Sequence, residues 1–151
     1  MNYREIFGEI LADHHESPRN WGSLKDATWT ERGFNPLCGD QVTLSCRIEG
    51  QGKECRLGAC AFEGEGCSIC MASASIMSEL IQGKSRDEVL ALIEAFRAKM
   101  QGADQVPGLP AEDSGEDIAA LYGVKRFPVR IKCALLPWTT LKKGLEAEHA
   151  G

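Results

Sequence analysis

Three cysteines, far apart in the chain, lie in settings that suit metal binding or sulfur chemistry. Cys38 stands in an Asn-Pro-Leu-Cys-Gly-Asp segment, where the proline and glycine predict a turn just before a strand. Asp40 follows two residues later, so that both side chains can face one ion. Cys67 follows a glycine-rich stretch and is predicted to open a helix, whose N-terminus stabilises a thiolate. Cys133 is likewise predicted to precede a helix.

Two cationic neighbours, Arg130 and Lys132, precede Cys133 and also favour a thiolate. For each cysteine taken alone, packing or capping of local structure is an alternative to a functional role. Together with Asp40, the three cysteines supply a complete tetrahedral donor set for zinc, which accepts thiolates and carboxylates. Their wide separation excludes a zinc-finger knuckle, so the fold must assemble the site. An iron–sulfur cluster on the same residues and a purely structural zinc domain are the alternatives.

Four further cysteines have weaker claims. Cys46 falls on the apolar face of an alternating segment, which predicts a place in the core. Cys55 and Cys60 have opposite parity on the next predicted strand, and nothing assigns either a function. Cys67 and Cys70 form a Cys-x-x-Cys pair, which is typical of redox motifs, although Cys70 lies one turn into the predicted helix between apolar residues. We expect His14 and His15 to be solvated at the end of the first helix.

The composition is that of a globular protein. The chain has 151 residues, which predicts a single domain over 1–151. Its formal net charge is −5 and no basic run stands out, so nucleic acid is not an expected partner. No apolar run approaches the roughly 20 residues that span a bilayer, and we expect no signal sequence in the opening segment, which carries charges where an apolar core would lie. Seven clustered cysteines without a secretion signal favour metal or sulfur chemistry in the cytoplasm.

The hydrophobic periodicity predicts an α+β fold, a small antiparallel sheet of about three strands with helices packed on one face. A helix near the N-terminus should stop before Pro18, and strands should occupy about 27–62 with a turn at 49–52. A helix from Cys67 to 83 and a second one with a Ser85–Glu88 capping box should follow. Residues 102–115 predict a surface loop leading to a short helix near 114–122. The last helix is predicted to begin after Cys133.

In that last helix, Pro137 is expected to occupy the first turn, where its missing N–H costs nothing.

The chain resembles the IscU/SufU family of iron–sulfur cluster assembly proteins, which includes the NifU N-terminal domain. The resemblance is carried by the segments 35–40, 62–75 and 130–136 and by the N-terminal stretch 13–20. The resemblance covers nearly the whole chain. It is strongest to the SufU-like branch, because Lys132 stands where the scaffold branch usually has histidine and the interval from Cys67 to Cys133 is long.

The resemblance implies a SufE/IscU-like fold and a zinc ion held by Cys38, Asp40, Cys67 and Cys133. It implies that Cys38 accepts persulfide sulfur from a SufS-type cysteine desulfurase and passes it toward a downstream cluster scaffold. Such a protein stimulates the desulfurase, and whether it counts as an enzyme in its own right stays open. The alternative within the family is an IscU-type scaffold, on which an iron–sulfur cluster is assembled.

Two cationic residues complete the implied site. Arg130, three residues before Cys133, also matches the SufU-like branch. We expect Arg130 or Lys132 to offset the negative charge of a zinc ion with three thiolates and a carboxylate, or to contact the partner protein.

Overall fold

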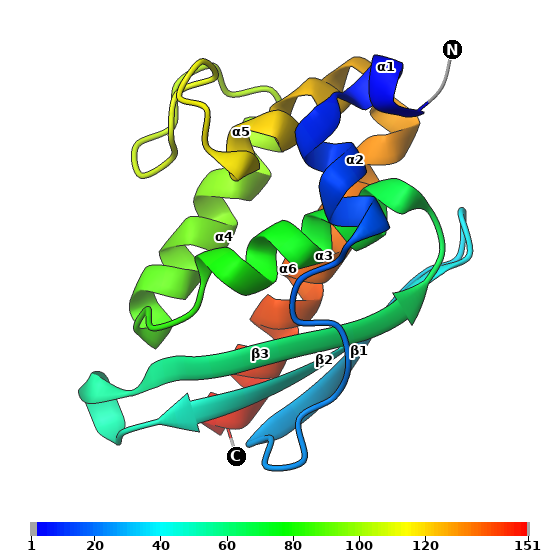
Figure 1. The fold of residues 1–151 in the computed structure, drawn as a ribbon. Coiled ribbons are helices and arrows are strands. Elements are labelled where there is room, and N and C mark those ends of the chain that lie inside the picture. Colours follow the sequence, from blue (N-terminus) through cyan, green and yellow to red (C-terminus); the bar gives the residue numbers. More distant parts are fainter. Residues whose placement is uncertain (1–2, 151) are drawn as a thin grey trace.

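The computed structural model describes residues 3–150, and the side chains from residue 4 to residue 147. Its centre is an antiparallel sheet of three strands in the order β1-β2-β3. The strands are β1 (Trp29–Asn35), β2 (Asp40–Glu49) and β3 (Arg56–Glu65). Figure 1 shows the helices gathered on one side of this sheet. The predicted α+β class and the small sheet are therefore confirmed.

The helices cover one face of the sheet because every second residue of β2 and β3 is apolar and lies on that face. Val42, Leu44 and Phe62 are all fully buried there, against α3 and α6. The helices are α1 (Tyr3–Phe7), α2 (Glu9–Glu16), α3 (Ser68–Leu80), α4 (Arg86–Met100), α5 (Asp117–Ala120) and α6 (Pro128–Ala150). Two short 3₁₀ segments, Gly52–Glu54 and Leu121–Arg126, complete the described elements.

The N-terminal helix is broken, although the sequence predicted it as one element. Gly8 has a φ of 90°, a left-handed conformation that an α-helix cannot include, and it separates α1 from α2. The stop before Pro18 is confirmed, since α2 ends at Glu16.

The segment between α2 and β1 protects the sheet. The amide of Phe62 donates to the carbonyl of Asn20, and the amide of Gly22 donates to the carbonyl of Phe62, so the outer edge of β3 is paired. The chain then crosses the face of the sheet that the helices leave open and enters β1, as Figure 1 shows. Ser45 and Ala61 on that face are consequently buried.

The region between α3 and α6 follows the sequence closely. Ser85 and Glu88 form the predicted capping box at the start of α4. The loop after α4 is held to the body by Lys99, whose ammonium donates to the carbonyl of Asp104 at 2.6 Å. The hydroxyl of Tyr122 donates to the carbonyl of Pro110 at 2.9 Å. The loop is thus anchored at both of its arms.

The start of the last helix was predicted wrongly. The helix α6 begins at Pro128, not after Cys133, and Pro137 lies inside it. Pro128 occupies the first helical position, where a proline is well tolerated. Pro137 cannot donate to the carbonyl of Cys133, so the helix loses one hydrogen bond at this point. Cys133 is therefore a residue of a helix and not of a junction.

Packing compensates for the internal proline. The hydroxyl of Ser73 in α3 donates to the carbonyl of Ala134 at 2.6 Å, and the indole N–H of Trp138 donates to Ser73 at 2.9 Å. Trp138 is fully buried and stacks on Phe96 with ring centroids 4.4 Å apart. These contacts fix α6 against α3 and α4 on either side of Pro137. Among the described residues, no helix is both long enough and apolar enough to cross a membrane.

Candidate metal centre

The turn between β1 and β2 presents Cys38 to solvent. Asn35 and Asp40 are paired across the two strands, and four residues connect them. The amide of Gly39 donates to the carbonyl of Asn35 at 2.9 Å, and Gly39 has a φ of 72°. The positive φ explains why a glycine follows Cys38. The predicted turn is confirmed, and Cys38 is exposed at its tip.

Asp40, in contrast, is fully buried. Its Oδ1 accepts the backbone N–H of Cys67 at 2.7 Å, and its Oδ2 faces the side-chain amide of Asn35 at 3.5 Å. A buried carboxylate is costly unless it is hydrogen-bonded or binds a cation. The first residue of β2 is thus tied directly to the start of α3.

Cys67 caps the N-terminus of α3, as the sequence predicted. It is half-buried, with extended backbone angles, at the point where β3 turns into the helix. The preceding Gly66 has a φ of 138° and lies against Asp40. The glycine therefore permits both the turn and the close approach of the two chain segments.

Cys133 brings the separate pieces together. It lies fully buried in α6, and its Sγ is 3.6 Å from the Sγ of Cys38. The ligand atoms of Cys38, Asp40 and Cys133 all lie within 4.8 Å of one another. Cys67 stands beside this group, and its thiol interacts with that of Cys133. Three of the four residues singled out from the sequence thus form one group of ligand atoms at one end of the sheet, and Cys67 lies beside that group but outside it.

The electrostatics of this cluster centre on Cys133. Burial raises the pKa of its thiol, and the hydrogen bonds that the thiol makes to the acceptors Asp40 and Cys67 raise it further. Arg130 lies one helical turn before Cys133 and is exposed. Burial disfavours its charge, but its hydrogen bond to Cys133 and the nearby thiolates outweigh that effect and raise the pKa of Arg130. Lys132 is exposed on the same turn, and no hydrogen bond or ion pair joins it to the described residues.

Asn35 is a residue of this site that the sequence analysis missed. It is buried, and its Nδ2 points at both the carboxylate of Asp40 and, at 4.0 Å, the Sγ of Cys133. Its Oδ1 accepts the backbone N–H of Leu37 at 3.3 Å, which shapes the turn that carries Cys38. The signal was present in the sequence, because asparagine before proline is typical of turns in which the side chain bonds the backbone two residues on.

Cys70 is a core residue, although it follows Cys67 by only three positions. It is fully buried in α3, and burial, followed by the charges of Asp40 and Cys67, raises the pKa of its thiol. A Cys-x-x-Cys pair that exchanges disulfides with another protein needs an accessible thiolate. The burial of Cys70 therefore weighs against disulfide exchange with a partner protein by the Cys67–Cys70 pair.

The expectation of a solvated His14 was wrong. Its side chain is 1% exposed, with Nδ1 2.7 Å from the hydroxyl of Ser75 and Nε2 2.6 Å from a carboxylate oxygen of Asp117. His14 thus joins α2 to α3 and α5. His14, Glu79 and Asp117 form a second group of potential ligand atoms. The direct hydrogen bonds of His14 indicate that this histidine has a structural role. His15 is exposed, as expected.

Substitution of Gly66 by alanine tests the packing of this site in the metal-free protein. A Cβ at Gly66 would stand 2.7 Å from the Cα of Asp40, and the residue would also be strained at its positive φ. We expect a loss of about 2–4 kcal/mol in the free energy of unfolding. This corresponds to a fall in melting temperature of roughly 5–12 °C.

Gly102→Ala is the matched control for this measurement. Gly102 has a φ of 115° but nothing within 4 Å of an added Cβ, so it reports the backbone strain alone. An equal loss of stability in both variants would show that the contact between Gly66 and Asp40 carries no weight.

The arrangement of these residues can be compared with known proteins. The model of the NifU-like N-terminal domain matches residues 6–134, which is most of the chain. This protein belongs to the NifU-like N-terminal domain family. The match includes all four residues of the candidate metal centre, and the resemblance inferred from the sequence is confirmed.

Within this family, the chain is similar to both sulfurtransferases and cluster scaffold proteins. It is 41% identical over 150 residues to the zinc-dependent sulfurtransferase SufU of Bacillus subtilis, covering 99% of this chain and 96% of the relative. It is 35% identical to the iron–sulfur cluster assembly scaffold protein IscU of Thermotoga maritima, covering 97% and 96%. The crystal structure of a SUF-system cluster assembly scaffold protein from Fervidobacterium islandicum is 33% identical and superimposes with a TM-score of 0.79, covering 95% and 99%.

Proposed function

We propose that this chain is a zinc-dependent sulfurtransferase, which accepts persulfide sulfur from a SufS-type cysteine desulfurase for iron–sulfur cluster biogenesis. The observation that carries the proposal is the placement of one exposed sulfur, that of Cys38, 3.6 Å from the buried sulfur of Cys133 and beside the buried Asp40. The likeness to the sulfurtransferase from Bacillus subtilis over the whole chain supports it. We propose the cytoplasm as its compartment, because free cysteines persist there.

The donor set fits a zinc ion. Two thiolates bound to tetrahedral zinc at about 2.3 Å lie about 3.8 Å apart, close to the separation of the Cys38 and Cys133 sulfurs. The buried carboxylate of Asp40 lies within the same group of ligand atoms. We propose that Cys67 supplies the fourth ligand from the N-terminus of α3. Bound zinc would keep these thiols deprotonated at neutral pH.

The four proposed ligands have two different roles, which are to hold the zinc ion and to react with sulfur. Asp40, Cys67 and Cys133 come from the sheet and two helices, so they are fixed by the core. Cys38 stands on an exposed turn and can move without unfolding any element. Cys38 is therefore the sulfur that accepts cargo, and the other three hold the site together.

The transfer step balances without an oxidant. The thiolate of Cys38 attacks the terminal sulfur of the desulfurase persulfide, and a new S–S bond forms on Cys38. The S–S bond within the donor persulfide breaks, and the electron pair leaves with the donor cysteine as a thiolate. Arg130 lies where its charge offsets the negative charge of the thiolates. A downstream cluster scaffold would then receive the sulfur.

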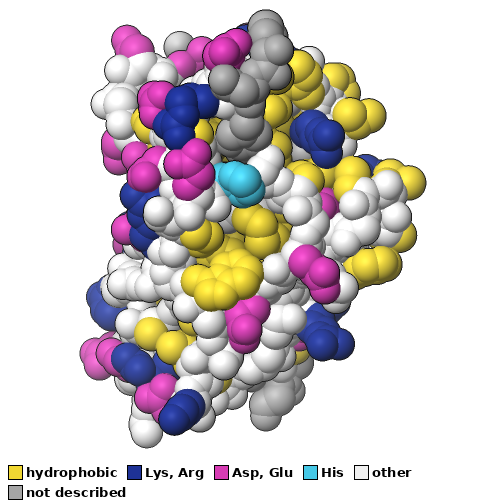
Figure 2. Space-filling view, turned by 45° about the vertical axis from the view of Figure 1, so that its right-hand side comes forward, with side chains coloured by type: hydrophobic (Ala, Val, Ile, Leu, Met, Phe, Trp, Pro, Cys, Tyr) yellow, Lys and Arg dark blue, Asp and Glu magenta, His cyan; other side chains and the backbone are white. Residues whose placement is uncertain are grey.

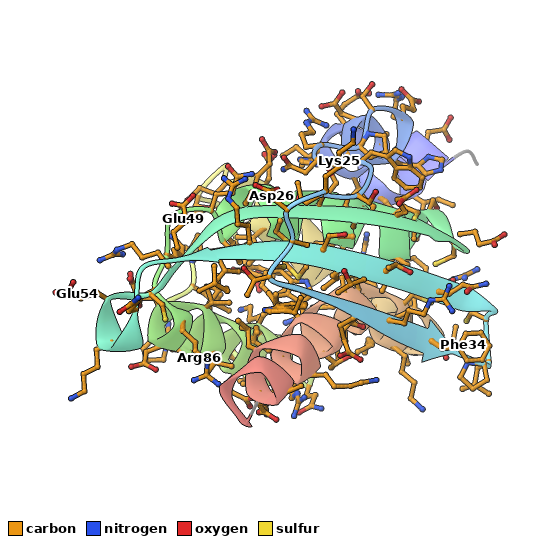
Figure 3. The ribbon with its side chains drawn as sticks, turned by 90° about the horizontal axis from the view of Figure 1, so that it is seen from below. Lys25, Asp26, Phe34, Glu49, Glu54 and Arg86 are labelled. Atoms are coloured by element: carbon orange, nitrogen blue, oxygen red, sulfur yellow. The ribbon has the colours of Figure 1, made fainter. Side chains whose placement is uncertain are left out.

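Exposed apolar side chains around Cys38 suit a protein donor better than a small molecule. Phe34, Leu37 and Val129 are 63%, 78% and 78% exposed, and they flank the site from the end of β1, from the turn and from the first turn of α6. Exposed large apolar residues that cluster in this way mark interaction surfaces. Figure 2 shows hydrophobic side chains gathered on this end of the molecule, and Figure 3 shows Phe34 projecting from the sheet. We propose that this apolar rim contacts the desulfurase.

Removal of the apolar rim should weaken binding of the desulfurase without loss of zinc. We expect each of Phe34→Ala and Leu37→Ala to raise the desulfurase concentration at half-maximal complex formation by at least about fivefold, or about 1 kcal/mol. Isothermal titration with a SufS-type desulfurase measures this change. Lys53→Ala, an exposed substitution in the far turn between β2 and β3, serves as the control. An unchanged affinity in the Phe34 and Leu37 variants would place the interface elsewhere.

Mass spectrometry tests the proposed function directly. The zinc-loaded protein is incubated with desulfurase, pyridoxal phosphate and L-cysteine, and its peptides are searched for an added sulfur atom. We expect the persulfide on Cys38. Absence of a persulfide on every cysteine would contradict sulfur transfer and leave a structural zinc domain.

A cluster scaffold is the second candidate, and the likeness to the scaffold proteins supports it. The same four residues would then hold iron. Anaerobic purification followed by metal analysis and a visible spectrum separates the two functions. A colourless protein with one zinc per chain supports sulfur transfer, and a coloured iron protein supports the scaffold.

A further inference from the structure

A pair of cysteines that the proposed function does not use lies in the core of the sheet. Cys46 on β2 and Cys60 on β3 are directly opposite each other in the antiparallel register. Their sulfur atoms are 2.9 Å apart, and the two side chains are 0% and 2% exposed. The geometry points to a reversible disulfide between Cys46 and Cys60, a redox-modification site separate from the candidate metal centre.

The backbone already meets the requirements of a disulfide. Residues directly opposite in an antiparallel pair have Cα atoms about 4.5–5.5 Å apart, which falls inside the range that disulfides span. The facing sulfurs need only a small side-chain movement to bond, because they are already closer than two non-bonded sulfurs normally stand. No change in strand register is required.

The pair is too far from the candidate metal centre to exchange with it. Cys46 lies six residues along β2 from Asp40, and at about 3.3 Å per residue this is a distance of about 20 Å. On the other side of the hairpin, Cys55 approaches the carbonyl of Gly52, so it does not compete for either partner. Cys46 and Cys60 are thus each other's partners among the described cysteines.

A small two-electron oxidant such as hydrogen peroxide completes the reaction. One thiolate takes an oxygen atom from the peroxide to form a sulfenic acid, and the O–O bond breaks with release of water. The second sulfur then attacks the first, the S–S bond forms, and the S–O bond breaks with release of a second water. Two thiols and one peroxide thereby give one disulfide and two waters.

The first of these steps is the slow one. The hydrogen bond that Cys46 donates to Cys60, together with burial, raises the pKa of the Cys46 thiol, so little thiolate is present to react. The second step is fast, because the partner sulfur is already in contact. We therefore expect the pair to stay reduced while the exposed Cys38 reacts, and to oxidise as a unit under sustained exposure.

The disulfide would cross-link the hairpin of β2 and β3, whose far ends lie at Asp40 and just before Cys67. Cys46 and Cys60 are separated by 14 positions in sequence, so their bond closes a loop across the turn between β2 and β3. Closing a loop of this length restricts the unfolded chain. We expect the melting temperature to rise by about 5–10 °C on oxidation.

Peptide mapping of the oxidised protein tests the proposal. The zinc-loaded full-length chain is treated with hydrogen peroxide, alkylated under denaturing conditions, and digested with trypsin together with proteases that cut at Asp40 and Glu63. These cuts separate Cys46 from Cys38, and Cys60 from Cys67, so a cross-linked peptide identifies its own cysteines. We expect a peptide joined through Cys46 and Cys60 that a dithiol reductant releases.

Two variants sharpen the result. Cys55→Ala should retain the cross-link and the gain in melting temperature, and Cys60→Ala should lose both. The wild-type map remains decisive even if the Cys60 variant folds poorly. If Cys46 and Cys60 are both still alkylated after sustained exposure to peroxide, long after Cys38 has been fully oxidised, the proposal is overturned, and the proposed sulfur transfer is unaffected.

Discussion

Cys38→Ala is expected to abolish stimulation of the desulfurase. Its side chain is the exposed sulfur of the site, so without it no thiolate can attack the donor persulfide. We expect turnover of L-cysteine to fall to the rate of the desulfurase alone, and persulfide to disappear from the protein. The stimulation is measured as the rate at which the desulfurase releases alanine with and without the variant.

The zinc content of the Cys38 variant separates reaction from structure. Asp40 and Cys133 are fully buried and Cys67 is fixed at the start of α3, so we expect them to retain part of the zinc and all of the fold. Cys55→Ala, at a half-buried cysteine outside the site, should stimulate the desulfurase like the wild type. Full stimulation by Cys38→Ala would rule out the proposed mechanism.

Asp40→Ala is expected to weaken the site and the fold together. The substitution removes a carboxylate that accepts the amide of Cys67 at 2.7 Å and leaves that amide without its partner. We expect the metal-free protein to lose about 1–3 kcal/mol in the free energy of unfolding. We also expect the zinc affinity to fall by more than about 100-fold, since loss of a mere outer-shell partner costs up to that much.

Asp40→Asn is the matched variant that divides these two effects. An asparagine can still accept the amide of Cys67, so the metal-free stability should stay close to that of the wild type. It carries no negative charge, so the zinc affinity should still fall. Competition with a chromogenic chelator measures the zinc affinity. Denaturant unfolding of the metal-free proteins measures their stability. Wild-type zinc affinity in both variants would remove Asp40 from the ligand set.

Zinc should also protect the wild-type protein against unfolding more than it protects either Asp40 variant. A ligand that binds only the folded state stabilises it by about 2.7 kcal/mol when present at 100 times its Kd. The stabilisation shrinks as the affinity falls. The two variants should therefore differ from the wild type most strongly with zinc present.

Local sequence patterns determined much of this protein. The alternation through Val42 and Leu44 predicted a half-buried strand, and Ser85 with Glu88 predicted the start of α4, because both signals depend on neighbours a few residues away. The types of the candidate ligands could likewise be predicted from the sequence, since thiolates and a carboxylate are donors that zinc accepts. The donor types and the predicted turn and helix-start positions suggested one shared site, and the resemblance to a family implied the same ligand set.

The tertiary structure decided what local spacing does not encode. Cys133 lies inside α6 because packing of Ser73 and Trp138 compensates for Pro137. His14 is buried because α5, a hundred residues away in the chain, supplies Asp117. Strand register and helix packing bring such residues together, and both depend on the whole core rather than on any one segment. The sequence thus determined the local elements and the donor types, and the packing of the core determined which side chains meet.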